Sequence, residues 1–121
     1  MRTAKETLIA FYDAMQRRDL AEARLCLDDN QIFYGLFETY PNADAYIKAL
    51  TGLLSVTTAI DVKLIAGDGD DAVIFFELDT KPPVEARTLV AEWHRVKNGK
   101  IVRSQSAFDG RVFAPMFTRK A

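Results

Sequence analysis

Glu92 and His94 are the two residues of this chain whose types and spacing best suit chemistry. They stand two positions apart in the run from Val90 to Val96, which alternates in the manner of a β-strand. Side chains two residues apart on a strand point to the same face of the sheet. A carboxylate and a histidine side by side in a half-dry pocket can exchange a proton near neutral pH. Alternatively, Glu92 pairs with an arginine at a wet sheet edge and His94 is a packed aromatic residue.

Polar and aromatic residues elsewhere could complete a binding site around this pair. The two tyrosines among them could donate hydrogen bonds into a cavity, although lone tyrosines also lie at the rim of a core. Two serines and a phenylalanine alternate along the last predicted strand, and an aspartate either lines the rim or simply ends that strand before a glycine. The candidate ligand-binding residues are Tyr12, Tyr34, Ser104, Ser106, Phe108 and Asp109.

The turn between the last two predicted strands decides which side chains face one another. A three-residue loop pairs Val96 with Lys100 and sets Glu92 opposite Ser104. A two-residue loop would pair Lys97 with Lys100, and like charges directly opposite one another are destabilising. We therefore expect the three-residue loop. One face then carries Glu92, His94, Val96, Val102, Ser104, Ser106 and Phe108, and the other carries Trp93, Arg95, Ile101, Arg103 and Gln105.

Two periodicities follow one another along the chain, first helical and then strand-like. Thr3 and Glu6 form a capping-box pattern that opens a helix extending to about residue 17. Asp19 begins a second helix that reaches about Leu27, and Pro41-Asn42 opens a third. A short strand precedes the third helix and longer strands follow it. The predicted strands cover 31–34, 60–66, 72–78, 86–97 and 100–109.

This order of elements predicts an α+β fold in which one curved antiparallel sheet has helices packed on one face. At 121 residues the chain suits a single domain spanning 1–121. The other face of such a sheet should be polar, yet the run from Val73 to Phe76 is apolar on both sides. We expect a second copy of the chain to cover that face in a homodimer. A locally apolar strand beneath a loop is the alternative.

Composition argues against several classes of partner. The net charge is −1, the pI is about 5.8 and the basic residues are scattered, so we expect no nucleic acid as a partner. No apolar stretch is long enough to cross a bilayer, and the first residues are polar, so we expect no membrane contact and a cytoplasmic location. Cys26 and His94, the one cysteine and the one histidine, supply no disulfide and no zinc ligand set. With no glycine-rich phosphate loop either, we expect no metal and no cofactor.

Several short segments occur in a characteristic order over nearly the whole chain. They are Phe11-Tyr12-Asp13-Ala14-Met15, Arg18-Asp19-Leu20, Leu27-Asp28-Asp29-Asn30, Asn98-Gly99-Lys100-Ile101-Val102 and Ala107-Phe108-Asp109. In this order they resemble the nuclear transport factor 2-like superfamily, in its ketosteroid-isomerase and polyketide-cyclase-like branch. The resemblance implies an α+β cone, in which a bent mixed or antiparallel sheet wraps around N-terminal helices and encloses an internal pocket, commonly in a dimer. It does not select an activity, because the superfamily holds enzymes and non-catalytic binding proteins.

Ketosteroid isomerases use three polar residues, and the resemblance finds a match for only one of them here. The phenolic donor aligns with Phe11, which has no hydroxyl, and the base aligns near Tyr34 or Gly35, neither of which is a carboxylate. The acid on the penultimate strand matches Glu92. We therefore expect no true ketosteroid isomerase activity.

Two functions remain open for a domain that binds a small, mainly apolar organic molecule. One is a cofactor-independent acid/base enzyme, an isomerase, cyclase or dehydratase in which Glu92 and His94 move protons. The other is a non-catalytic ligand-binding or dimerisation module. The absence of counterparts to the other two ketosteroid isomerase residues favours the second function. The two ionisable groups on one inferred inner face favour the first.

Overall fold

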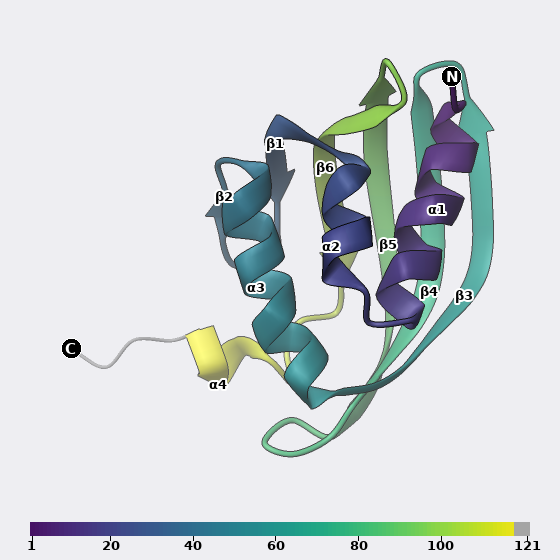
Figure 1. Cartoon of the computed structure of the whole chain (residues 1–121). Coiled ribbons are helices and arrows are strands. Elements are labelled where there is room, and N and C mark those ends of the chain that lie inside the picture. The colour runs from purple at the N-terminus through teal and green to yellow at the C-terminus, as the bar shows by residue number, and fades with distance from the viewer. Residues whose placement is uncertain (118–121) are drawn as a thin grey trace.

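A computed structural model of the chain describes residues 1–117. Three helices lie on one face of a six-stranded sheet that bends around them, and a fourth, short helix follows the last strand (Figure 1). The elements are α1 (Ala4–Gln16), α2 (Leu20–Leu25), β1 (Leu27–Tyr34), β2 (Thr39–Tyr40), α3 (Ala43–Val56), β3 (Thr57–Asp68), β4 (Asp71–Thr80), β5 (Ala86–Lys97), β6 (Lys100–Phe108) and α4 (Ala114–Phe117).

The strand order in the sheet is β2-β1-β6-β5-β4-β3. β1 and β6 run parallel, and the other neighbouring strands run antiparallel. The chain therefore leaves β1 and β2, passes through α3 to the opposite edge at β3, and returns strand by strand until β6 lies beside β1. This arrangement confirms the predicted bent α+β cone, with a sheet that is mixed rather than purely antiparallel.

Local sequence signals explain where the helices begin and which face of α1 is buried. Thr3 accepts a hydrogen bond from the backbone N–H of Glu6, and the Glu6 carboxylate accepts one from the backbone N–H of Thr3, which completes the predicted capping box. Asn42 caps α3 through the N–H of Ala45. The buried face of α1 carries an apolar stripe of Ala4, Leu8, Phe11, Tyr12 and Met15.

Aromatic rings hold the helices on the sheet. Tyr46 of α3 stacks on Phe33 of β1 with 4.3 Å between ring centroids, and Phe11 of α1 packs against Tyr46 at 6.3 Å. Tyr12 packs against Phe76 of β4 at 5.2 Å. These contacts fix α1 and α3 across the inner face of the sheet, because interlocked buried rings leave little freedom to shift.

The turn between β5 and β6 differs from the predicted one. Asn98-Gly99 forms a two-residue turn with φ angles of 53° and 72°, and Lys97 lies opposite Lys100. The two ammonium groups bind different partners, because Lys97 Nζ lies 2.7 Å from a carboxylate oxygen of Asp70 and Lys100 Nζ lies 3.0 Å from the carbonyl oxygen of Leu25. The prediction of a three-residue loop was therefore wrong, since these partners offset the repulsion on which it rested.

A one-residue bulge at Val102 then shifts the register of β6. Val96 lies opposite Ile101, but the next residue of β5, Arg95, lies opposite Arg103. The two-residue turn already sets Ile101 opposite Val96, so Ile101 is buried in the core, whereas Val102 is only half-buried. The faces predicted for these two residues are therefore reversed.

The remaining strands follow the prediction apart from their ends and one additional strand. β3 and β4 extend beyond the predicted ranges 60–66 and 72–78. β1 begins at Leu27 instead of residue 31, and its pairing with β6 is irregular between Leu27 and Ile32. The two-residue strand β2 was not predicted. In β4, Ile74 is buried whereas Phe75 points to the uncovered face and is 38% exposed, so this strand is apolar on both sides, as predicted.

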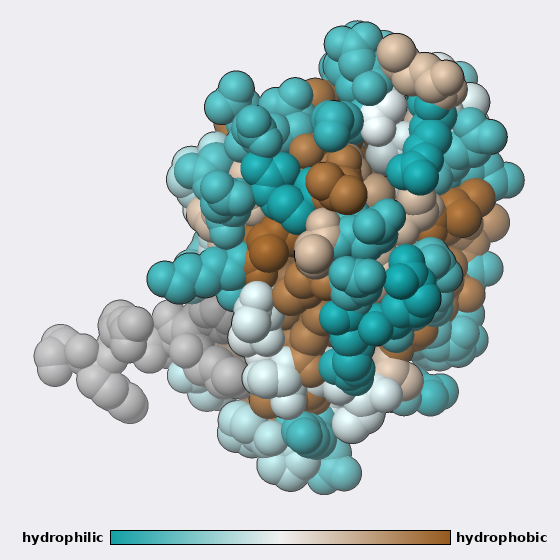
Figure 2. Space-filling view, viewed as in Figure 1, coloured by the Kyte–Doolittle hydropathy of each residue, from teal (hydrophilic) through white to brown (hydrophobic). Residues whose placement is uncertain are grey.

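The face of the molecule that carries the helices is largely polar, with apolar side chains visible over α2 and α3 in its centre (Figure 2). Within residues 1–117, the structure contains no helix long and apolar enough to span a membrane.

Candidate functional site

The inner face of β5 carries the candidate site. Side chains at alternate positions of this strand are buried beneath the helices, as the alternation predicted, and they are Thr88, Val90, Glu92, His94 and Val96. Glu92 keeps 8% of its surface exposed and His94 only 1%. Glu92 is therefore the nearer of the two to solvent, and His94 lies deeper in the cone.

Tyr12 reaches this face from α1, and its hydroxyl donates a hydrogen bond to Oε1 of Glu92. Burial, followed by the charge of Glu92, raises the pKa of Tyr12 well above its ordinary value of 10.0. The hydroxyl therefore keeps its proton at neutral pH and acts as a fixed donor. Tyr12 is the neighbour of Phe11, the position that the family resemblance had aligned with a phenolic donor.

A buried chain of hydrogen bonds continues from Glu92 into the core. Nε2 of His94 lies 3.0 Å from the same oxygen, Oε1 of Glu92, and Nδ1 of His94 lies 2.7 Å from Oγ of Ser104. Nε2 of Gln31, on β1, donates to Ser104 Oγ at 3.2 Å. Sequence reasoning missed Gln31, although its place two residues before Phe33 in a predicted strand could have assigned it to the inner face.

The two carboxylate oxygens of Glu92 have different surroundings. Oε1 accepts hydrogen bonds from both Tyr12 and His94, whereas the part of the chain that the structure describes gives Oε2 no hydrogen-bond partner. A carboxylate held in this manner has a fixed orientation and one oxygen available to accept a proton.

Ser106 and Phe108 lie on β6 near Glu92. The two-residue turn and the bulge in β6 together set Ser106 opposite Glu92, where the prediction had Ser104, and Ser106 is 9% exposed. Phe108 is half-buried, and its ring lies 6.3 Å from that of Phe37 and 6.0 Å from that of Phe113. These two residues lie on the inner side of the sheet with Glu92. Ser104, by contrast, has no exposed surface, and its hydroxyl is engaged with His94.

Tyr34 and Asp109 lie apart from this cluster. The Arg103 guanidinium lies 5.1 Å from the ring centroid of Tyr34 and 5.9 Å from that of Trp93, which places Tyr34 on the outer face of the sheet. Asp109 is exposed and pairs with Arg111, whose hydrogen bonds lower the pKa of Asp109 to about 2. Neither residue contacts the chain of hydrogen bonds around Glu92.

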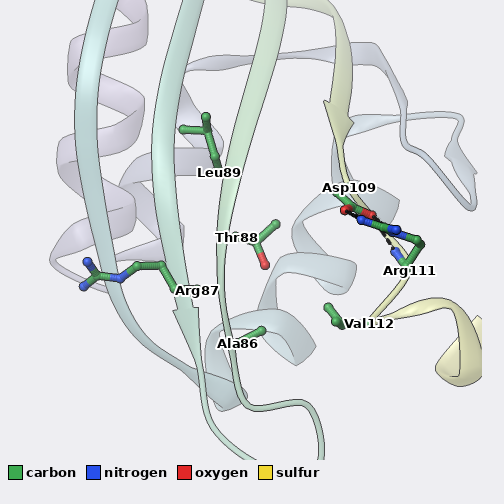
Figure 3. A pocket seen from close by; sticks show the side chains of 7 residues that line it. All are labelled: Ala86, Arg87, Thr88, Leu89, Asp109, Arg111 and Val112. Carbon is green, nitrogen blue, oxygen red and sulfur yellow. Dashed lines mark hydrogen bonds and ion pairs between the residues drawn. The ribbon is translucent and has the colours of Figure 1, made fainter.

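A hollow of about 500 Å³ opens where β5 extends beyond the end of β6. Thr88 points across the opening toward Asp109, while Arg87 and Leu89 point away from it (Figure 3). Thr88 shares the inner face of β5 with Glu92, and the four steps along the strand from one to the other span about 13 Å. The hollow thus lies at the end of the cone nearer Glu92. Its lining residues are Ala86, Arg87, Thr88, Leu89, Asp109, Arg111 and Val112.

The sequence pattern of SnoaL-like domains matches residues 8–104, and the chain therefore belongs to the SnoaL-like domain family. This family lies within the nuclear transport factor 2-like superfamily, so the resemblance predicted from the sequence is confirmed. No curated protein matches the chain.

Several solved structures have the same fold as this chain. A putative polyketide cyclase from Sinorhizobium meliloti is 13% identical, with a TM-score of 0.75 over 84% of this chain and 93% of that one. A putative ketosteroid isomerase from Kribbella flavida is 13% identical, with a TM-score of 0.75 over 88% and 77%. TerC, co-crystallised with polyporic acid, is 15% identical, with a TM-score of 0.79 over 94% and 97%. At these identities the likeness establishes a shared fold and leaves the activity open.

Proposed function

We propose that this protein is a cofactor-independent acid/base enzyme that acts on a small, mainly apolar organic molecule. The observation that carries the proposal is the asymmetry of Glu92, whose Oε1 is held by Tyr12 and His94 while Oε2 has no partner among the described residues. A general base needs such an oriented carboxylate with a free oxygen in a partly dry site. The folds of the putative cyclase and the putative isomerase described above are consistent with this chemistry.

The proposed step is a proton transfer at carbon. Oε2 of Glu92 accepts a proton from a substrate carbon next to an electron-withdrawing group, and the electron pair of the broken C–H bond moves into the substrate. Glu92 then returns the proton at another atom, which completes an isomerisation or assists a cyclisation or dehydration. Tyr12 and His94 keep the carboxylate in place throughout, because both donate to the oxygen that does not react.

Access to Glu92 is proposed to lead through the hollow between β5 and the segment after β6. Thr88, at its edge, and Glu92 share one strand face, and Ser106 and Phe108 flank the same inner surface from β6. This surface combines apolar side chains with few polar groups, as binding sites for small organic molecules do.

Deuterium exchange tests the proposal directly. Steroids, terpenoids and aromatic polyketides are first screened by thermal shift, and each compound that binds is then incubated with the protein in D₂O. We expect deuterium to enter the bound compound at carbon, and Glu92→Gln to slow this exchange by about 10²–10⁴-fold while binding is retained. Glu22→Gln, which changes an exposed glutamate on α2, is the matched control and should leave exchange unchanged.

The same experiment distinguishes the alternative function. Binding without exchange, or equal exchange by Glu92→Gln and the unmodified protein, would refute the enzyme proposal and support a non-catalytic binding module.

We also propose a homodimer through the outer face of the sheet. Leu64, Phe75, Leu89 and Trp93 are 53%, 38%, 56% and 44% exposed there, on neighbouring strands. Exposed apolar residues grouped on one sheet face favour a protein partner, and a second copy offers the same face to itself. Trp93→Asp should weaken association in sedimentation experiments, and Trp93→Phe should retain most of it. A monomeric unmodified protein at micromolar concentration would contradict the homodimer.

A further inference from the structure

Ser104 and Gln31 extend the hydrogen-bonded chain beyond His94, on the side away from Glu92. Neither residue has any exposed surface, so both lie deeper than the part of the site that a ligand could reach. Ser104 contacts Nδ1 of His94, and Gln31 contacts Ser104. The proton transfer proposed above gives these two polar residues no direct task, and burying them is unfavourable unless they are hydrogen-bonded.

The position of each proton along this row of hydrogen bonds can be worked out from Glu92, which needs a hydrogen-bond donor. An ionised carboxylate can only accept hydrogen bonds, so His94 must carry a proton on Nε2 in order to bind Oε1. In the neutral ring, Nδ1 is then bare and accepts the hydroxyl proton of Ser104. The Ser104 oxygen in turn accepts an amide proton from Gln31. Every donor in the chain therefore points toward Glu92.

Gln31 shows the direction of the chain most clearly. Its Oε1 is buried and has no partner within residues 1–117, while its Nε2 is engaged with Ser104. Half a turn of the amide would present Oε1 to Ser104, which would then donate to Gln31 and accept from Nδ1 of His94. A neutral His94 would in that case lose the Nε2 proton that binds Glu92, and only a doubly protonated ring could keep both contacts.

We propose that Gln31 is a positioning residue, which donates to Ser104 and thereby holds neutral His94 with its proton on Nε2. His94 can then donate to Glu92 and hold that carboxylate in one orientation. The consequence for catalysis rests on the proposed function, whereas the tautomer of His94 is a property of the protein alone.

Because His94 is the only histidine in the sequence, ¹⁵N NMR of labelled protein reports its tautomer without ambiguity. At a pH where the ring is neutral, the unmodified protein should show the proton on Nε2. Gln31→Glu keeps the shape of the side chain but, when ionised, only accepts, so Ser104 must donate to it and Nδ1 of His94 should become protonated. Gln31→Met removes the amide without adding an acceptor, so it should weaken the preference for the proton on Nε2 without reversing it, and its spectrum should fall between those of the unmodified protein and Gln31→Glu.

Ser104→Ala provides a second variant that introduces no buried charge. It breaks the link between Gln31 and His94, so both tautomers should become populated. If His94 keeps its proton on Nε2 in Ser104→Ala and in Gln31→Glu alike, Glu92 alone sets the tautomer and the proposal is wrong. A proton on Nδ1 in the neutral unmodified protein would also overturn it. These spectra are independent of deuterium exchange, so failure of the enzyme proposal and failure of this inference give different results.

Discussion

Tyr12→Phe should destabilise the folded protein through the loss of one buried hydrogen bond. The Phe ring can keep the packing of Tyr12 against Phe11, Phe76 and His94, whose ring centroids lie 5.2, 5.2 and 6.1 Å away. The hydroxyl that donates to Glu92 is lost. A hydrogen bond to a charged group contributes about 1.5–3 kcal/mol to the free energy of unfolding. For a chain of this length that loss corresponds to roughly 5–15 °C in Tm.

The loss in free energy of unfolding caused by Tyr12→Phe should become smaller at high pH. Burial raises the pKa of Tyr12 well above 10.0, so above that pH the unfolded chain loses the phenolic proton while the folded protein keeps it. The corresponding stabilisation is complete below about pH 10 and is lost as the pH rises toward the folded pKa, by about 1.4 kcal/mol per pH unit. Tyr46 behaves in the same way, because burial also raises its pKa. The Tyr12→Phe variant lacks the pH-dependent contribution of Tyr12, whereas the unmodified protein loses that stabilisation above pH 10. The difference in free energy of unfolding between the two proteins should therefore decrease above pH 10.

Urea unfolding of Tyr12→Phe at pH 7 and at several values above pH 10 measures both effects. Glu92→Gln provides the second arm of a double-mutant cycle, because a neutral amide oxygen can still accept from Tyr12 but binds it less strongly. We expect Tyr12→Phe to cost about 1 kcal/mol less in that background. An equal cost in both backgrounds, together with no change between pH 7 and pH 11, would refute a charge-assisted hydrogen bond between these residues.

Further substitutions probe the site, the turns and helix α3. Ser106→Leu should fill the inner face, so calorimetry should detect no binding of a compound that binds the unmodified protein; retained affinity would exclude this surface as the site. Asn98→Ala should lower the free energy of unfolding by about 1–2 kcal/mol, because φ is 53° at this residue. Asn98→Gly should lower it by less, and equal urea midpoints for the two variants would contradict this. Gly35→Ala brings a Cβ to 2.7 Å from the backbone carbonyl oxygen of Glu38, which cannot move aside as a side chain can, and should destabilise by about 1–3 kcal/mol. Gly52→Ala, whose Cβ meets nothing within 4 Å, should stabilise α3 by about 0.5–1 kcal/mol; opposite signs in thermal melts would contradict both.

The elements and the inner face of β5 were predictable because local signals decide them. The capping residues Thr3 and Asn42 mark helix starts without reference to the rest of the fold. The alternation around Glu92 and His94 assigns both to one face of a strand whatever its neighbours are. The family pattern then selected the cone from the α+β folds that share this order of elements.

The pairing of β5 with β6 could not be predicted, because contacts outside the hairpin determine it. Repulsion between Lys97 and Lys100 argued against the observed turn, but Asp70 and the Leu25 carbonyl bind the two ammonium groups separately. Both partners are distant in the sequence from the lysines that they bind. Gln31 was overlooked for a similar reason, because its partner Ser104 lies on a strand that becomes its neighbour only through the parallel pairing of β1 with β6.

The bulge at Val102 allows both Ile101 and Ser104 of β6 to face the core. Ile101 and Ser104 both face the core, although residues an odd number of positions apart point to opposite faces of an unbroken strand. The bulge absorbs one residue, so Ile101 can pair with Leu27 in the core while Ser104 still meets His94. Without it, either the apolar residue or the serine that contacts His94 would point to solvent. A single unpaired residue thus lets β6 complete the apolar core and hold the buried polar chain of the site at the same time.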